Sequence, residues 1–276
     1  MGGDILPHRG LAALASVLLV LLVACGQPVV TTEPVYQSIQ AQGSTTLSPL
    51  VTELAAAFHE QAPAVSLAVD GAGTGYGLEA LRTGEADLAL ASWLPADMNP
   101  SWQATPIARD GIAIIIHPDN PIEGLGLLQL QDLFSGRAYE WEAVGAPPAQ
   151  GVVQPVSREE GSGTRAVFEA LAMDGQSVTL RAVVVTSSQG VVDYVASHPQ
   201  AIGYVSISYL SPAVKAVAVE REAPTSAAVR QGSYPLSREL WLVTLDPPPP
   251  AVQQFLDFVL SPAGQAIVGK RYARIR

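Results

Sequence analysis

A strand, a turn rich in glycine and hydroxyl residues, and a helix follow one another three times in this sequence. The clearest copy is the turn Gly161-Ser162-Gly163-Thr164, between an apolar run at 152–156 and a helix-forming run at 166–172. The other two turns lie at 43–48 and 71–77. Because the carboxyl ends of strands in an α/β sheet share one edge, three such turns predict one shared ligand site.

The residues of the turn at 161–164 favour binding of an anion. Glycines let the backbone approach a ligand closely, and the first turn of a helix leaves N–H donors without intrahelical partners. The helix dipole and the nearby Arg158 add positive potential at the same place. Taken alone, the turn also fits an ordinary N-capped helix, so the prediction depends on the repetition of the pattern.

Other glycine-rich motifs are absent from the sequence. The glycines at 71–77 do not complete G-x-G-x-x-G, and neither G-x-x-x-x-G-K-[ST] nor G-x-S-x-G occurs anywhere in the chain. The spacing therefore gives no support to a dinucleotide fold, a P-loop or a hydrolase nucleophile elbow.

Composition narrows the function classes further. The 276 residues are 48% hydrophobic and 14% charged, which is enough apolar material for one large domain or two ordinary ones. A formal net charge of −10 argues against nucleic acid as a partner. The four histidines are far apart and the chain has a single cysteine, so no metal-ligand spacing, disulfide framework or cofactor is predicted.

The N-terminus is typical of a processing signal. Arg9 precedes the apolar run 11–23, which is short for a membrane span and suits a signal h-region. The following Leu22–Gly26 resembles a bacterial lipobox, which implies cleavage before Cys25 and a lipid on its sulfur. Residues 1–24 are then a lipoprotein signal peptide and 25–35 a tether; an uncleaved anchor with a buried cysteine is the alternative.

The remaining pattern predicts an α/β fold. Apolar runs typical of strands alternate with amphipathic helical segments along most of the chain. Predicted strands lie at 38–41, 65–69, 87–91, 107–117, 152–156, 181–186, 202–205, 214–219 and 235–245. Predicted helices begin near 48, 78, 127, 166, 189, 251 and 261, and 139–150 is predicted to be a loop.

Seven segments together resemble the phosphate-binding proteins of bacterial phosphate ABC importers. They follow the family's order: 43–50, 71–77, 109–113, 158–165, 202–205, 234–238 and 255–268. The resemblance implies a two-lobed type II periplasmic-binding-protein-like fold, each lobe a mostly parallel sheet flanked by helices. Lobe one would be 36–118 plus 213–276 and lobe two 119–212, closing on one oxyanion.

The resemblance also implies the binding residues. Arg158 would be the guanidinium that holds the anion, with Glu160 behind it as its orienting partner. Arg165, one helical step further on, would face away from the cleft or brace a carboxylate. The hydroxyl and N–H donors would come from the three turns and the end of the 87–91 strand: Thr45, Thr46, Thr74, Ser92, Ser162, Gly163 and Thr164.

One position departs from the family pattern. After the strand at 87–91 some members place Ser-Asp, whose carboxylate accepts the proton of hydrogen phosphate, and others Ser-Arg; this chain has Ser92-Trp93. A carboxylate there would repel a fully deprotonated anion. Its absence predicts weaker selectivity for phosphate over sulfate, unless Trp93 only covers the cleft edge and another group accepts the proton.

The expected function is therefore a monomeric, extracytoplasmic receptor, lipid-anchored to the cell membrane, that delivers phosphate to an ABC permease and its ATPase. A receptor for sulfate, molybdate or tungstate and a lipoprotein that only senses phosphate are alternatives. An enzyme such as a phosphatase is disfavoured, because metal ligands, a Ser-His-Asp/Glu set and a cysteine nucleophile are all missing from the sequence pattern.

Overall fold

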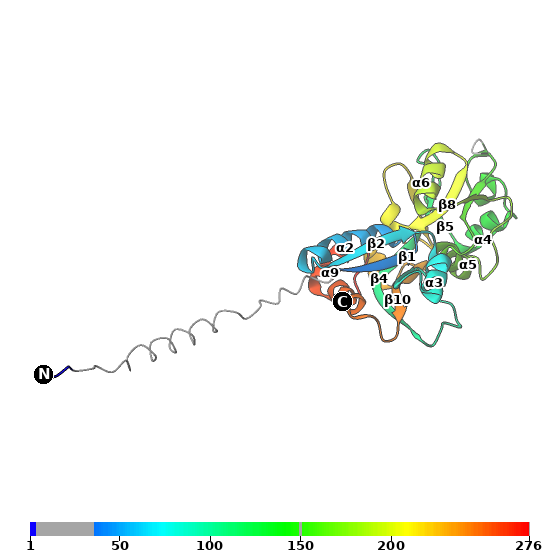
Figure 1. The fold of residues 1–276 in the computed structure, drawn as a ribbon. Helices are drawn as coiled ribbons and strands as arrows, with labels where there is room; N and C mark the ends of the chain where they lie inside the picture. The colour runs from blue at the N-terminus through cyan, green and yellow to red at the C-terminus, as the bar shows by residue number, and fades with distance from the viewer. Residues whose placement is uncertain (4–35, 149–150, 276) are drawn as a thin grey trace. The chain divides into compact units, whose positions relative to one another are not determined.

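The computed structural model describes residues 1–3, 36–148 and 151–275. The folded part, Tyr36–Arg276, is one compact unit (Figure 1). The predicted lipidation site Cys25, the tether and most of the predicted signal peptide lie outside the described residues. In the described part of the chain, no helix combines the length and the apolarity needed to cross a bilayer.

Strands and helices alternate along the folded unit, as the sequence predicts. The strands are β1 (Gln37–Gly43), β2 (Val65–Gly71), β3 (Leu88–Ala91), β4 (Trp102–Ile116), β5 (Gly124–Leu125), β6 (Gln154–Arg158), β7 (Val183–Val185), β8 (Ala201–Ser206), β9 (Lys215–Val219) and β10 (Ser237–Leu245). The helices are α2 (Ser48–Gln61), α3 (Thr74–Thr83), α4 (Leu127–Ser135), α5 (Gly163–Leu171), α6 (Ser188–Ser197), α7 (Ser226–Gln231), α8 (Pro250–Leu260) and α9 (Pro262–Val268), with 3-10 turns η1 (Trp141–Val144) and η3 (Ile207–Tyr209).

The sheet is mixed, and its main path runs β2-β1-β3-β10-β4-β8-β6-β7. Parallel pairs lie toward its two ends, β2-β1-β3 and β8-β6-β7, while β10 and β4 are antiparallel to their neighbours. The long strand β4 joins the two groups, because it pairs with β10 up to Gly111 and with β8 from Ile112 onward. The parallel groups place several strand ends, and the helix starts that follow them, near the middle of the sheet.

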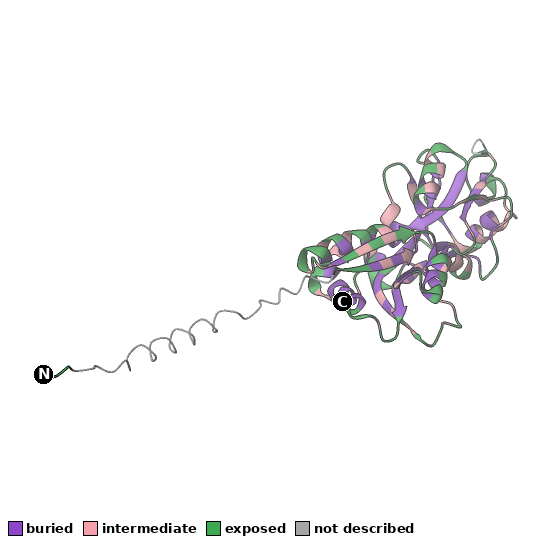
Figure 2. Cartoon of the chain, viewed as in Figure 1, coloured by how far each residue is buried: buried purple, intermediate pink, exposed green. Residues whose placement is uncertain are grey.

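The buried residues, purple in Figure 2, form separate hydrophobic clusters, and the two largest divide along β4. One cluster contains Ile107, Ala108 and the buried face of α2, including Leu54. A second contains Ile112–Ile116 and Trp141. Cluster membership thus changes along β4, between 108 and 112; the lobe boundaries at residues 118 and 212 stay a prediction.

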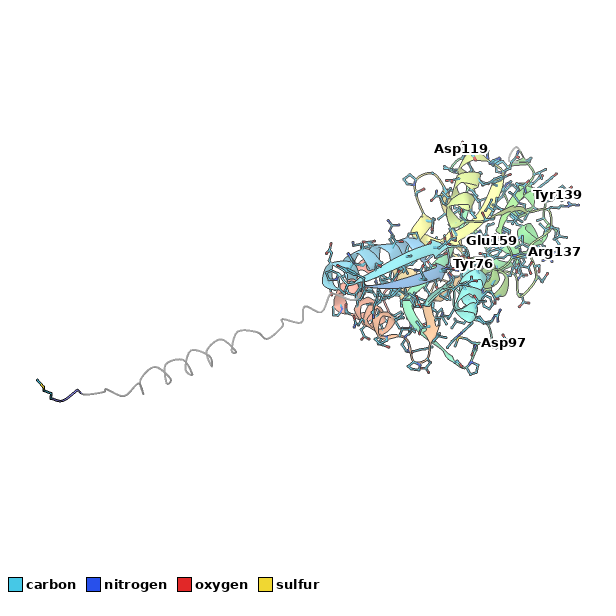
Figure 3. The ribbon with its side chains drawn as sticks, in the orientation of Figure 1. Tyr76, Asp97, Asp119, Arg137, Tyr139 and Glu159 are labelled. Atoms are coloured by element: carbon cyan, nitrogen blue, oxygen red, sulfur yellow. The ribbon has the colours of Figure 1, made fainter. Side chains whose placement is uncertain are left out.

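Several element boundaries differ from those predicted. Helix α3 begins at Thr74 rather than 78, and α5 at Gly163 rather than 166, because a first helical turn needs no intrahelical N–H partners and can include glycine and threonine. Helix α2 begins at Ser48 as predicted, with Leu47 as its N-cap. Strand β7 is shorter than predicted, and the predicted loop at 139–150 contains η1. The side chains of Asp119 and Tyr139 are exposed on the surface of the folded unit (Figure 3).

Candidate functional site

The turns that the sequence singles out lie against one another. The N–H of Gly75, at the start of α3, donates to the carbonyl of Gly161 at 3.0 Å. Thr46 Oγ1 and Thr164 Oγ1 lie 3.2 Å apart, although 118 residues separate them in the chain. The 43–48, 71–77 and 161–164 turns therefore meet at one place, which is the arrangement that their repetition predicts.

Thr74 and Ser92 form the side of this site next to α3. Both are buried, and the Ser92 N–H donates to Thr74 Oγ1 at 3.1 Å. The Ser92 hydroxyl also makes a short hydrogen bond with the hydroxyl of Ser44. Gly163 closes against this side: a Cβ atom built on it would lie 2.5 Å from Thr74 Oγ1 and 2.7 Å from Trp93 Cδ1. Only glycine allows α5 to begin this close.

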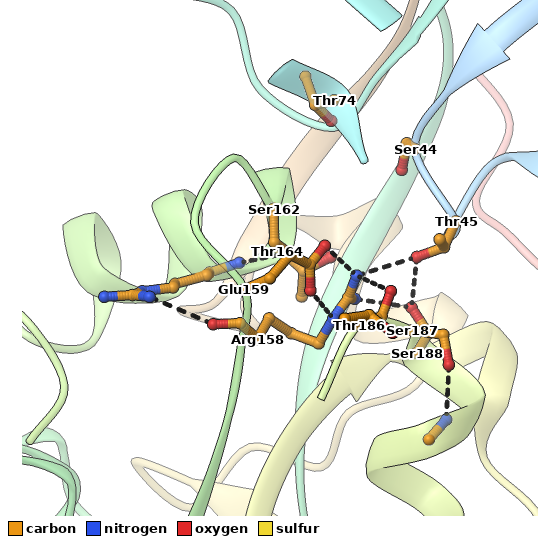
Figure 4. Close-up of polar contacts among 12 residues, drawn as sticks. Ser44, Thr45, Thr74, Arg158, Glu159, Ser162, Thr164, Thr186, Ser187 and Ser188 are labelled. Atoms are coloured by element: carbon orange, nitrogen blue, oxygen red, sulfur yellow. Dashed lines mark hydrogen bonds and ion pairs between the residues drawn. The ribbon is translucent and has the colours of Figure 1, made fainter. Parts of the chain in front are cut away.

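Arg158, at the end of β6, reaches across the site with a side chain that is 2% exposed (Figure 4). Its Nη1 donates to Ser188 Oγ and its Nη2 to Thr45 Oγ1, each at 3.2 Å. Its orienting partner is Glu159, which accepts from Nε at 2.9 Å and from Nη2 at 2.8 Å. The prediction of Glu160 was wrong, because the chain turns after β6 so that Glu159 faces the guanidinium and Glu160 is exposed.

Ser162 and Arg165 stabilise the start of α5 and the backbone before it. Ser162 is its N-cap, and its hydroxyl accepts from the Arg165 N–H at 3.3 Å. Arg165 Nε donates to Glu169 at 2.9 Å, and its Nη1 donates to the Arg158 carbonyl at 3.2 Å. Arg165 therefore braces a carboxylate, as predicted, and also holds the backbone of Arg158.

Sequence reasoning missed a second arginine at the site. Arg238 on β10 lies opposite Asp110 on β4, and its Nη2 donates to Asp110 Oδ2 at 2.8 Å. Its Nη1 donates to Thr164 Oγ1 at 3.0 Å and its Nη2 to Thr46 Oγ1 at 3.4 Å. Asp110 lies inside the largely apolar strand β4 and Arg238 lies near the start of β10, and charged residues inside strands are rarely buried without a partner. That pattern was a usable signal for this pair.

Burial shifts the pKa of Asp110. Desolvation of the fully buried carboxyl raises its pKa above the ordinary value. Arg238, the Ser206 hydroxyl and the Gly111 N–H oppose this shift, because each stabilises the charged carboxylate. The Ser206 hydroxyl donates to Asp110 Oδ1 at 2.7 Å, so both carboxylate oxygens have donors.

Ser188 and two tyrosines were also missed. Ser188 begins α6 after Thr186-Ser187, so the strand, hydroxyl turn and helix pattern occurs a fourth time. Tyr209 donates to the Thr45 carbonyl at 2.6 Å and Tyr272 to the Thr46 carbonyl at 2.7 Å. Burial raises the pKa of each phenol, which keeps both tyrosines protonated as donors.

The site offers donors, while its carboxylates are already occupied. Among the described residues, the N–H groups of Thr74, Gly163 and Thr164 have no hydrogen-bond partner. Both arginines are paired with carboxylates, Glu159 and Asp110. Within the described residues, no group of three or more His, Cys, Asp or Glu side chains could hold a metal ion. The arrangement suits an oxyanion that takes hydrogen bonds from hydroxyls, N–H groups and a guanidinium.

A mixed α/β sheet with four helix starts at one donor-rich site is the architecture of the periplasmic-binding-protein class. The sequence model of the PBP superfamily domain matches residues 28–263. The chain belongs to this superfamily and, within it, to the family of PstS phosphate-binding proteins.

Individual relatives agree with this assignment. PstS of Pseudomonas aeruginosa PAO1 is 30% identical over 264 residues, covering 84% of this chain and 81% of the relative. PstS of Bacillus subtilis 168 is 28% identical over 230 residues, covering 81% and 75%. A crystal structure from Clostridium perfringens with bound phosphate has a TM-score of 0.83 and 31% identity, and the match covers 87% of this chain and 100% of that one.

Proposed function

We propose that this chain is the extracytoplasmic solute-binding component of a phosphate ABC importer and binds inorganic phosphate as a receptor, without catalysing a reaction. The observation that carries the proposal is the buried Arg158 guanidinium, held by Glu159 and surrounded by hydroxyls from separate helix starts. The sequence similarity to PstS proteins and to the Clostridium perfringens protein, whose structure contains phosphate, supports phosphate as the ligand.

In this proposal the phosphate lies in the cleft between lobe one, 36–118 plus 213–276, and lobe two, 119–212. Arg158 is the main charged anchor, and the ligand shifts an equilibrium between open and closed lobes. The remaining contacts come from the hydroxyl and N–H groups predicted from the sequence: Thr45, Thr46, Thr74, Ser92, Ser162, Gly163 and Thr164.

The proposal also includes the membrane and the transport partners. A lipid on Cys25 would hold the monomeric receptor at the outer face of the cell membrane or in the periplasm, where it would deliver phosphate to an ABC permease and its ATPase. The relative from Vibrio cholerae, 29% identical with a TM-score of 0.73, is described as an ABC-type phosphate transport receptor. Mass spectrometry of the membrane fraction would detect the lipid on Cys25.

Isothermal titration against phosphate, sulfate, molybdate and tungstate tests the ligand directly. We expect phosphate to bind with the highest affinity and one site per chain. Tighter binding of another oxyanion would instead favour a receptor for that anion, and no binding of any of the four would contradict the proposal.

Trp93 leads to a prediction about selectivity. Its indole Cδ1 faces Gly163, and both oxygens of Asp110 and of Glu159 already accept hydrogen bonds. Each of these two carboxylates is paired with an arginine, and neither stands at the position after Ser92. We expect excess sulfate to compete with phosphate at neutral pH, and Trp93→Asp to reduce that competition by on the order of tenfold, because a carboxylate repels the fully deprotonated anion.

The measurement is the phosphate affinity with and without a large excess of sulfate, in the wild type and in Trp93→Asp. Trp93→Asn is the matched control, since it removes the indole without adding a charge. A wild type that ignores sulfate, together with an aspartate variant that gains nothing, would show that another group accepts the proton.

A further inference from the structure

The Arg238–Asp110 pair holds one guanidinium in a fixed position beside two hydroxyls. Arg238 Nε and Nη2 donate to Asp110 Oδ2 at 3.0 and 2.8 Å, and the two side chains are 3% and 0% exposed. Ser206 occupies the other carboxylate oxygen. Because all of these groups are buried, the direction in which the remaining N–H groups of Arg238 point is set by the protein.

The hydrogen-bond roles at Thr46 and Thr164 follow from this position. A guanidinium can only donate, so both Oγ1 atoms accept from Arg238. The two oxygens are 3.2 Å apart and can use only one of their two protons on each other. The other hydroxyl proton has no acceptor among the described residues, so it is available to a ligand.

We propose that Arg238 is a positioning residue of the anion site: held by Asp110, it turns the hydroxyls of Thr46 and Thr164 so that the proton they do not share is donated to the bound oxyanion. This role rests on the proposed function, because it requires an anion beside both hydroxyls. Arg158 provides a parallel, since its guanidinium donates to Thr45 and Ser188 in the same way. The consecutive residues Thr45 and Thr46 are thus oriented by different arginines.

Arg238→Lys tests the role with the charge preserved. Lysine keeps the ion pair with Asp110 but lacks the planar fork that reaches both threonines. We expect phosphate binding measured by titration calorimetry to weaken about tenfold, as for the loss of a hydrogen bond in a charged network. Arg109→Lys is the matched control. Arg109 precedes Asp110 on β4, is half exposed and is paired with Glu239. We expect the Arg109→Lys variant to bind phosphate with wild-type affinity.

A double-mutant cycle separates positioning from a structural effect. If Arg238 acts through the hydroxyls, its replacement should cost only about threefold in a Thr164→Val background, where Thr46 alone remains to be oriented. If the losses of affinity in Arg238→Lys and Thr164→Val simply multiply in the double variant, the proposal is overturned. Wild-type affinity in Arg238→Lys would overturn it as well. If the lysine variant does not fold, the neutral pair Arg238→Gln with Asp110→Asn replaces it in the same cycle, and thermal unfolding without phosphate verifies the fold of each variant.

The outcomes also separate this role from the proposed function. A wild-type chain that does not bind phosphate would contradict the proposed function itself. A wild-type chain that binds phosphate while the two substitutions act independently would contradict only the positioning role of Arg238.

Discussion

Replacing Arg158 with alanine is expected to weaken phosphate binding by about thirtyfold to several thousandfold, which corresponds to about 2–5 kcal/mol. The guanidinium is buried and bonded to Glu159, Thr45 and Ser188, so it is already oriented before an anion arrives. Its removal also leaves the Glu159 carboxylate without its cation, beside the site of an anion. Isothermal titration with phosphate measures the loss.

Arg165→Ala is the comparison for Arg158→Ala, because it removes a guanidinium from the same motif. Arg165 is bonded to Glu169 and to the Arg158 carbonyl, and it is partly exposed. We expect a loss of less than about fivefold, in line with a partly exposed ion pair. Near-wild-type phosphate affinity in Arg158→Ala would show that Arg158 is not the anchor.

The parts of the site that the sequence predicts are those set by local chemistry. Glycine and hydroxyl residues between an apolar strand and a helix mark a helix start wherever the chain goes afterwards, and this identified the turns around Thr45, Thr74 and Gly163. The same rule also applies to Ser188, which was missed because its turn contains no glycine before the helix.

The parts that were missed depend on tertiary register. Arg238 and Asp110 are 128 residues apart, and they meet because the antiparallel pairing of β10 with β4 places them opposite each other. A shift of one residue would place Arg238 opposite Arg109 or Gly111 instead, and the pair with Asp110 would be lost. The choice of Glu159 over Glu160 likewise depends on where the chain turns after β6, which composition does not specify.

Gly163→Val is expected to weaken phosphate binding by on the order of a hundredfold, because overpacking at a close contact costs a few kcal/mol. A Cβ at this position would lie 2.5 Å from Thr74 Oγ1, 2.7 Å from Trp93 Cδ1 and 2.9 Å from Ser92 Cβ. These atoms lie around α3 and the end of β3, whereas Gly163 begins α5. The added side chain therefore pushes the start of α5, with its two unpaired N–H donors, away from the other turns.

The steric origin of this effect can be tested with graded side chains. Gly163 does not have the left-handed backbone that only glycine adopts easily, so alanine adds bulk without backbone strain and should give an intermediate loss. Gly124→Ala is the control, since its nearest contact would be an ordinary 3.4 Å. Titration calorimetry gives the affinities, and thermal unfolding without phosphate shows whether the fold is retained. Equal affinities for glycine, alanine and valine at 163 would mean that phosphate binding does not require this close approach of α5.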